Sequence, residues 1–141
     1  MSGEKYNTNL ASEFYVLSLL HRLGMDAMLT LGNKKSVDLV AVNSEGKSYT
    51  IDVKGLAGKT SWPVDNVKLE KASHFLVFVC YHGAIANLAA LPETWVIPST
   101  ALTPFIYHAP GGRKVVERRR LLKEAELFKD AWHLLTGLPE S

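Results

Sequence analysis

The spacing of hydrophobic residues divides the chain into an amphipathic helix, a group of strands and a helical C-terminal part. Apolar residues recur at helical spacing over 9–23, where Asn9 can cap a helix and Gly24 can end it. The inward face of this predicted helix is Leu10, Phe14, Leu17 and His21.

Short runs rich in β-branched and apolar residues predict the strands, which are 25–31, 36–42, 48–54, 74–81 and 94–97. Asn43–Gly46 has the composition of a hairpin turn, so the strands on either side of it should be antiparallel neighbours. We expect loops around Gly55, Gly58 and Pro63 and over 104–112, and a short helix over 66–72. The stretch 84–91 fits no single element.

Periodic apolar residues predict a last helix over about 117–136, with an edge strand over 114–121 as the alternative for its start. Its apolar face would be Leu121, Leu122, Ala125, Phe128, Ala131, Trp132 and Leu135. The order of elements predicts an α/β fold, a three-layer sandwich with a central mixed β-sheet flanked by helices.

The composition is that of an ordinary globular protein, and 141 residues predict a single domain over 1–141. Cys80 is the only cysteine, so no internal disulfide can form, which favours the cytoplasm. The longest apolar run, 75–81, is too short to span a membrane, and no membrane partner is expected. The five histidines show no zinc-ligand spacing.

Basic residues gather between Arg113 and Glu124, where six bases and two acids give a local charge of +4 on a chain of net charge +2. Such a block, with Arg118, Arg119 and Arg120 at its centre, suits contact with phosphates. A solvated helix face is the equally weighted alternative. The same two interpretations apply to the pair Lys34 and Lys35.

Two aspartates occupy adjacent predicted strands. Asp52 and Lys54 share one face of their strand, and Asp38 can lie beside Asp52 across the hairpin. Two adjacent carboxylates repel each other, and a divalent cation removes that repulsion. Oxygen-only ligands favour Mg²⁺ or Mn²⁺ over zinc.

Glu13 supplies a third acid, on the apolar side of the first helix. Each residue has a plainer interpretation: Asp38 as an exposed strand residue, Asp52 and Lys54 as a surface ion pair, and Glu13 as a favourable first-turn acid. The order and spacing of all four together favour a functional site.

The stretch from Asn9 to Lys54, read as ASEFYVLSLLHRLG, SVDLVAV and YTIDVKG, resembles the PD-(D/E)xK nuclease superfamily, which includes restriction endonucleases and archaeal-type Holliday junction resolvases. The resemblance implies a restriction-endonuclease-like fold. Asp38 and Asp52 match the two acids of the motif, Lys54 its lysine, and Glu13 the helix acid. Val37 stands where the motif has proline.

The resemblance also implies a mechanism. Asp38, Asp52 and the Val53 carbonyl would hold Mg²⁺, and Lys54 would orient or help deprotonate the attacking water during phosphodiester hydrolysis. The loop residues Lys59 and Trp62 would border the site and touch nucleic acid, and the chain could act as a homodimer.

Two alternatives stay open. Because the motif proline is missing, the fold could serve as a nucleic-acid-binding module without catalysis. A protein-interaction domain is favoured if Asp38 and Asp52 lie too far apart to share an ion.

Overall fold

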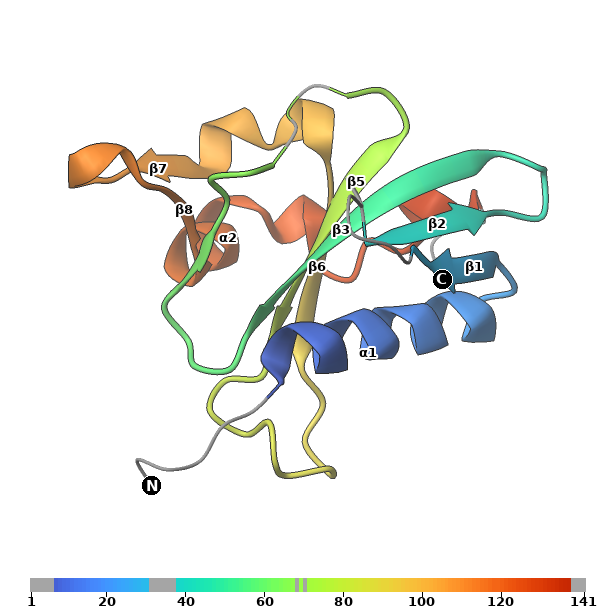
Figure 1. Cartoon of the computed structure of the whole chain (residues 1–141), viewed down its shortest axis with the longest axis horizontal. Helices are drawn as coiled ribbons and strands as arrows, with labels where there is room; N and C mark the ends of the chain where they lie inside the picture. The colour runs from blue at the N-terminus through green and yellow to red at the C-terminus, as the bar shows by residue number, and fades with distance from the viewer. Residues whose placement is uncertain (1–6, 31–37, 68, 70, 138–141) are drawn as a thin grey trace.

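A mixed five-stranded sheet is the centre of the computed structural model, which describes residues 7–30, 38–67, 69 and 71–137 (Figure 1). Its strands are β1 (Asp26–Leu29), β2 (Leu39–Val42), β3 (Ser48–Leu56), β5 (His74–Cys80) and β6 (Glu93–Pro98). They lie in the order β1-β2-β3-β5-β6. The pairing of β3 with β5 is parallel, and the other pairings are antiparallel.

A smaller three-stranded sheet lies beside it, with the order β4-β8-β7. Its strands are β4 (Ser61–Pro63), β7 (Ile106–His108) and β8 (Lys114–Glu117). The helices are α1 (Thr8–Arg22), α2 (Arg118–Glu124) and α3 (His133–Thr136), with 3-10 turns at Ser99–Ala101, Thr103–Phe105, Pro110–Gly112 and Glu126–Phe128. The fold is therefore mixed α/β, as the sequence predicts. No helix in the described part of the chain is long and apolar enough to cross a membrane.

Two hydrophobic cores lie on opposite faces of the large sheet, and the side-chain alternation of β3 separates them. Tyr49, Ile51 and Val53 belong to the first core, together with residues of α1 and α3. The second core is formed by alternate residues of β5 and β6 with the small sheet and α2. The even-numbered side chains of β3, which include Asp52 and Lys54, therefore face the side of the second core.

Helix α1 confirms the predicted element, but its predicted inward face is wrong. The buried side chains are Ser12, Glu13, Val16 and Leu20, whereas Leu10 and Phe14 are 42% and 52% exposed. The physical reason is the close approach of α1 to Gly55 on β3, where a Cβ would lie 3.0 Å from the Ser12 Cβ. The small residues at this crossing bring the face that carries Ser12 against β3. The N-cap is Asn7, two residues earlier than the predicted cap Asn9.

The hairpin between β2 and β3 forms as predicted. The Asn43 Oδ1 accepts hydrogen bonds from the backbone N–H groups of Glu45 and Lys47, both at 3.0 Å. Gly46 adopts a φ of +82°, a conformation that glycine takes at no steric cost. β3 runs two residues beyond the predicted end, to Leu56, and the predicted start of its partner strand at 36 and 37 lies outside the described residues.

The prediction of one continuous helix over 117–136 is wrong. Chain segments of this range bury their apolar residues on opposite faces of the large sheet: Leu121 and Ala125 in the second core, Ala131 and Leu135 in the first. The chain must therefore cross the edge strand β6. It does so at Asp130, whose N–H donates to the Thr94 carbonyl at 3.0 Å, while the Thr94 hydroxyl donates to its carboxylate at 2.6 Å. The alternative strand is present as β8, which precedes α2, but it is the central strand of the small sheet and not an edge strand.

The helix expected over 66–72 is absent from the described residues of that range. Lys71 is instead tied to the 3-10 turn after β6: its N–H donates to Ser99 Oγ at 3.1 Å, and the Ser99 hydroxyl donates to its carbonyl at 2.7 Å. Two predicted loops also contain short strands, β4 and β7, which pair with β8. Local composition does not predict pairings between strands that lie this far apart in the sequence.

Candidate functional site

Asp38 lies directly before β2, and its carboxylate accepts a backbone N–H of β3 that would otherwise face a backbone acceptor of the neighbouring strand. Alternation turns the N–H of Val53 toward β2, but β2 starts only at Leu39, whose partner is Ile51. Asp38 Oδ2 accepts that N–H at 2.8 Å. The backbone carbonyl of a strand residue points to the same neighbour as its N–H, so the Val53 carbonyl faces this edge as well.

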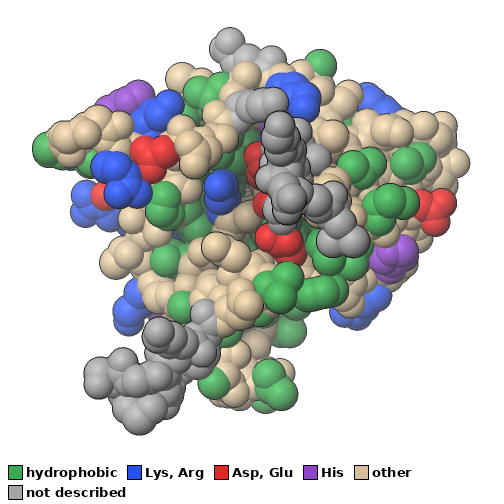
Figure 2. Space-filling view, in the orientation of Figure 1, with side chains coloured by type: hydrophobic (Ala, Val, Ile, Leu, Met, Phe, Trp, Pro, Cys, Tyr) green, Lys and Arg blue, Asp and Glu red, His purple; other side chains and the backbone are tan. Residues whose placement is uncertain are grey.

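Asp52 lies on β3 between the two residues that Asp38 contacts. The Asp38 N–H donates to the Ile51 carbonyl at 3.0 Å, and the Asp38 carboxylate accepts the Val53 N–H at 2.8 Å. Figure 2 shows acidic side chains gathered near the middle of the visible face, with a Lys or Arg side chain beside them. Asp38 therefore lies directly before β2, beside the part of β3 that carries Asp52.

His74 is a site residue that the sequence analysis missed. It begins β5 as the parallel partner of Thr50, and its side chain is 1% exposed against 13% for Asp52. Its Nε2 lies 3.2 Å from Asp52 Oδ2, and its Nδ1 lies 2.7 Å from the Thr50 hydroxyl. No motif could have signalled it, because the contact depends on β3 and β5 being parallel neighbours in one particular register.

Lys54 lies one pleat beyond Asp52 on the same face of β3. It is partly buried, and no ion pair joins it to another of the residues that the structure describes. Glu13 comes from α1, on the opposite face, where it is 9% exposed. Lys54 and Asp52 thus share one face of β3, and Glu13 lies on the other side of the sheet.

The candidate donors at this edge are the Asp38 and Asp52 carboxylates and the Val53 carbonyl, all of them oxygen atoms. This chemistry fits a hard cation such as Mg²⁺ or Mn²⁺. Among the described residues, no three His, Cys, Asp or Glu side chains are gathered closely enough to hold a metal ion. The fit therefore rests on Asp38, Asp52 and the Val53 carbonyl.

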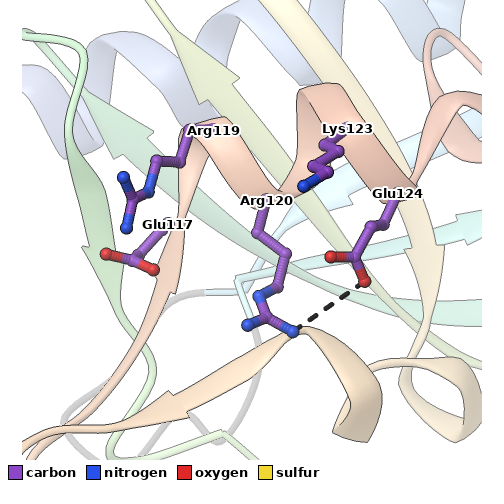
Figure 3. Close-up of a pocket in the computed structure, with 5 residues that line it drawn as sticks. All are labelled: Glu117, Arg119, Arg120, Lys123 and Glu124. Carbon is purple, nitrogen blue, oxygen red and sulfur yellow. Dashed lines mark ion pairs between the residues drawn. The ribbon is translucent and has the colours of Figure 1, made fainter.

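A basic hollow of about 360 Å³ lies between β8 and α2 (Figure 3). It is lined by Glu117, Arg119, Arg120, Lys123 and Glu124. The only ion pair drawn there is a long one, 3.9 Å between Arg120 Nη1 and Glu124 Oε1, and Arg119 and Lys123 are exposed. Exposed ion pairs contribute little free energy, so these side chains can bind an anion in place of their present contacts at little free-energy cost.

The hollow belongs to the same side of the large sheet as Asp52, because β8 and α2 cover the second core. The Arg118 N–H donates to the Thr60 carbonyl at 2.8 Å, which ties the start of α2 to the loop that follows β3. That loop carries Lys59, which is exposed. The predicted contacts Lys59, Arg119 and Arg120 are therefore all reachable from solvent at this end of β3.

Two predicted nucleic-acid contacts are corrected. Trp62 is fully buried, and its indole N–H donates to the Val79 carbonyl at 3.1 Å, so it is a core residue and cannot stack on a base. Arg118 donates two hydrogen bonds to Glu93, at 2.8 and 3.0 Å, and this pair lowers the pKa of Glu93. The guanidinium fork of Arg118 is thus occupied within the protein. Lys34 and Lys35 lie outside the described residues.

Comparison with known proteins identifies a likeness in fold to a solved structure. No family model and no curated protein matches the chain. Among solved structures, the chain is similar to the bacterial homing endonuclease I-Ssp6803I, with a TM-score of 0.61 and 16% sequence identity. The match covers 96% of this chain and 93% of that chain. The two proteins therefore share a fold over nearly their whole lengths.

Proposed function

We propose that this chain is a metal-dependent endonuclease that hydrolyses phosphodiester bonds in DNA. The observation that supports the proposal is the hydrogen bond from the Val53 N–H to Asp38 Oδ2, which places the Asp38 carboxylate beside the strand that carries Asp52 and Lys54. The likeness in fold to a homing endonuclease supports it. The chain would then belong to the PD-(D/E)xK superfamily, with the restriction-endonuclease-like, three-layer form of the fold.

In this proposal Asp38, Asp52 and the Val53 carbonyl hold Mg²⁺ or Mn²⁺. The bound ion would polarise the scissile phosphate and lower the pKa of a water molecule. Lys54 places a positive charge on the face where the phosphate must lie, which offsets charge that grows during in-line attack. Its amine is suited to orient the water because no ion pair with the described residues holds it elsewhere.

The proposed path of the DNA runs from this site toward the basic hollow. Arg119, Arg120 and Lys123 would bind backbone phosphates there, and Lys59 would lie between the hollow and Lys54. Backbone contacts of this kind position nucleic acid without reading its sequence. We further propose that the protein acts in the cytoplasm, and that two copies pair when both strands of a duplex are cut.

Nicking of supercoiled plasmid in Mg²⁺ or Mn²⁺ tests the proposal. Asp52→Asn should lower the rate by about 100-fold or more, since it removes a ligand charge while keeping the shape of the side chain. Asp26→Asn is the matched control, because Asp26 is an exposed aspartate on β1. Equal nicking by wild type and Asp52→Asn would exclude the assignment.

The alternative is a DNA-binding or protein-interaction domain of the same fold without catalysis. The observation that favours it is the lack of a three-carboxylate cluster among the described residues. Salt-dependent DNA binding that persists with EDTA and in Lys54→Ala, without nicking under any metal, would establish the binding function instead.

A further inference from the structure

The structure assigns His74 as a positioning residue for the Asp52 carboxylate, and we propose that this buried histidine sets the affinity of the site for its divalent cation. The inference rests on the proposed function, because it concerns the same carboxylate. It adds a residue that belongs to no part of the D-x-K pattern.

The hydrogen-bond chemistry fixes the state of the ring. An ionised carboxylate only accepts hydrogen bonds, so Nε2 of His74 carries the proton that faces Asp52 Oδ2, at 3.2 Å. Nδ1 lies 2.7 Å from the Thr50 hydroxyl. Both ring nitrogens are used, so the ring cannot flip without breaking both bonds.

Burial makes this arrangement rigid. The side chain of His74 is 1% exposed, and the residue lies at the start of β5, next to its partner Thr50 on β3. Asp52, 13% exposed, would otherwise rotate about its terminal torsion, which is broad for a carboxylate. The imidazole therefore selects one orientation of the carboxylate plane.

A fixed orientation suits a cation site, because Asp52 then presents its carboxylate in one direction. Outer partners that orient a ligand in this way typically change metal affinity 10–100-fold when they are removed.

Two substitutions separate the orienting role from a merely structural one. Glutamine can place its amide N–H near the position of Nε2, whereas the shorter asparagine side chain reaches only the position of Nδ1. Both variants remove the same buried ring, so both should lose thermal stability. A structural role predicts similar Mn²⁺ affinities for the two variants.

The experiment is a titration of each full-length protein with Mn²⁺, in which free Mn²⁺ is followed by electron paramagnetic resonance and unfolding by circular dichroism. The expected result is a 10–100-fold weaker Kd for His74→Asn, of the order seen for other outer partners, and a Kd close to wild type for His74→Gln. Equal affinities of His74→Asn and wild type overturn the inference and leave the proposed function standing. If both variants weaken binding equally, the role is structural and the inference fails.

If His74→Asn does not fold, Thr50→Val takes its place, since it keeps the ring but removes the hydroxyl that holds Nδ1. It should weaken Mn²⁺ binding several-fold, and an unchanged Kd overturns the inference. A wild-type protein that binds no Mn²⁺ overturns both the inference and the proposed function.

Discussion

Gly55 is the point where α1 crosses β3, and Gly55→Ala should destabilise the protein more than Gly58→Ala in the loop that follows this strand. An added Cβ would clash with Ser12 Oγ and lie 3.0 Å from both the Ser12 Cβ and the Thr8 carbonyl oxygen. The hydroxyl of Ser12 could rotate away, although it would then lose its 2.7 Å hydrogen bond to that carbonyl. The other two atoms belong to the helix framework and cannot move alone.

The cost follows from this geometry. Real Cβ atoms rarely approach as close as 3.0 Å, so α1 must move away from β3 by several tenths of an ångström. Overpacking of this kind costs about 1–3 kcal/mol. For a domain of this size, 1 kcal/mol shifts the Tm by about 3–4 °C, so we expect Gly55→Ala to lower the Tm by ~3–12 °C.

The assay is thermal and urea unfolding of three variants. Gly58→Ala is the control, because nothing lies within 4 Å of its added Cβ and its stability should stay near wild type. Ser12→Ala combined with Gly55→Ala should recover part of the loss, since it removes the clashing hydroxyl but not the Thr8 carbonyl. If Gly55→Ala proves as stable as Gly58→Ala, the tight crossing is wrong and Glu13 is not held beside β3 as described.

Other predictions concern the remaining titratable contacts. The pKa of Glu93 is lowered by hydrogen bonds from Arg118, so its contribution to stability is present above its ordinary pKa of 4.5 and is lost as pH falls through the lower folded value. Glu93→Gln should therefore cost about 1–3 kcal/mol in urea unfolding at neutral pH and progressively less in acid; a constant difference across pH contradicts the pairing. Burial raises the pKa of Cys80, so a disulfide reagent should label it only on unfolding, and fast labelling of native protein would show that this strand is accessible.

The sequence predicted the first helix, the central strands and the β2–β3 hairpin because each carries a strong local signal. Hydrophobic periodicity and a turn of Asn43–Gly46 composition suffice to pair β2 with β3, and Asp38 then lies beside the part of β3 that carries Asp52. A site formed by the two adjacent strands of a hairpin can therefore be predicted from the sequence.

The C-terminal part shows where such reasoning ends. Its apolar spacing is helical, but Leu121 and Leu135 serve cores on opposite faces of the sheet. Periodicity reports which residues are buried and says nothing of the face on which each is buried. Backbone pairing of Lys129 with Trp95 then outweighs local helix propensity.

Trp62 and His74 were misjudged for a related reason. A tryptophan in a glycine-rich stretch has the composition of an exposed contact, yet its neighbours come from β5 and β6, far away in the sequence. His74 has no spacing motif, and its contact with Asp52 exists only because β3 and β5 pair in parallel. Long-range register determines both positions.

The position of Mn²⁺ in crystals of the protein, found by anomalous scattering, tests most directly the central claim that one cation lies between Asp38 and Asp52. We expect an ion that contacts carboxylate oxygens of both residues and the Val53 carbonyl, at about 2.0–2.6 Å, and that is lost in Asp52→Asn. An ion that binds away from both aspartates, or none at saturating Mn²⁺, would contradict it.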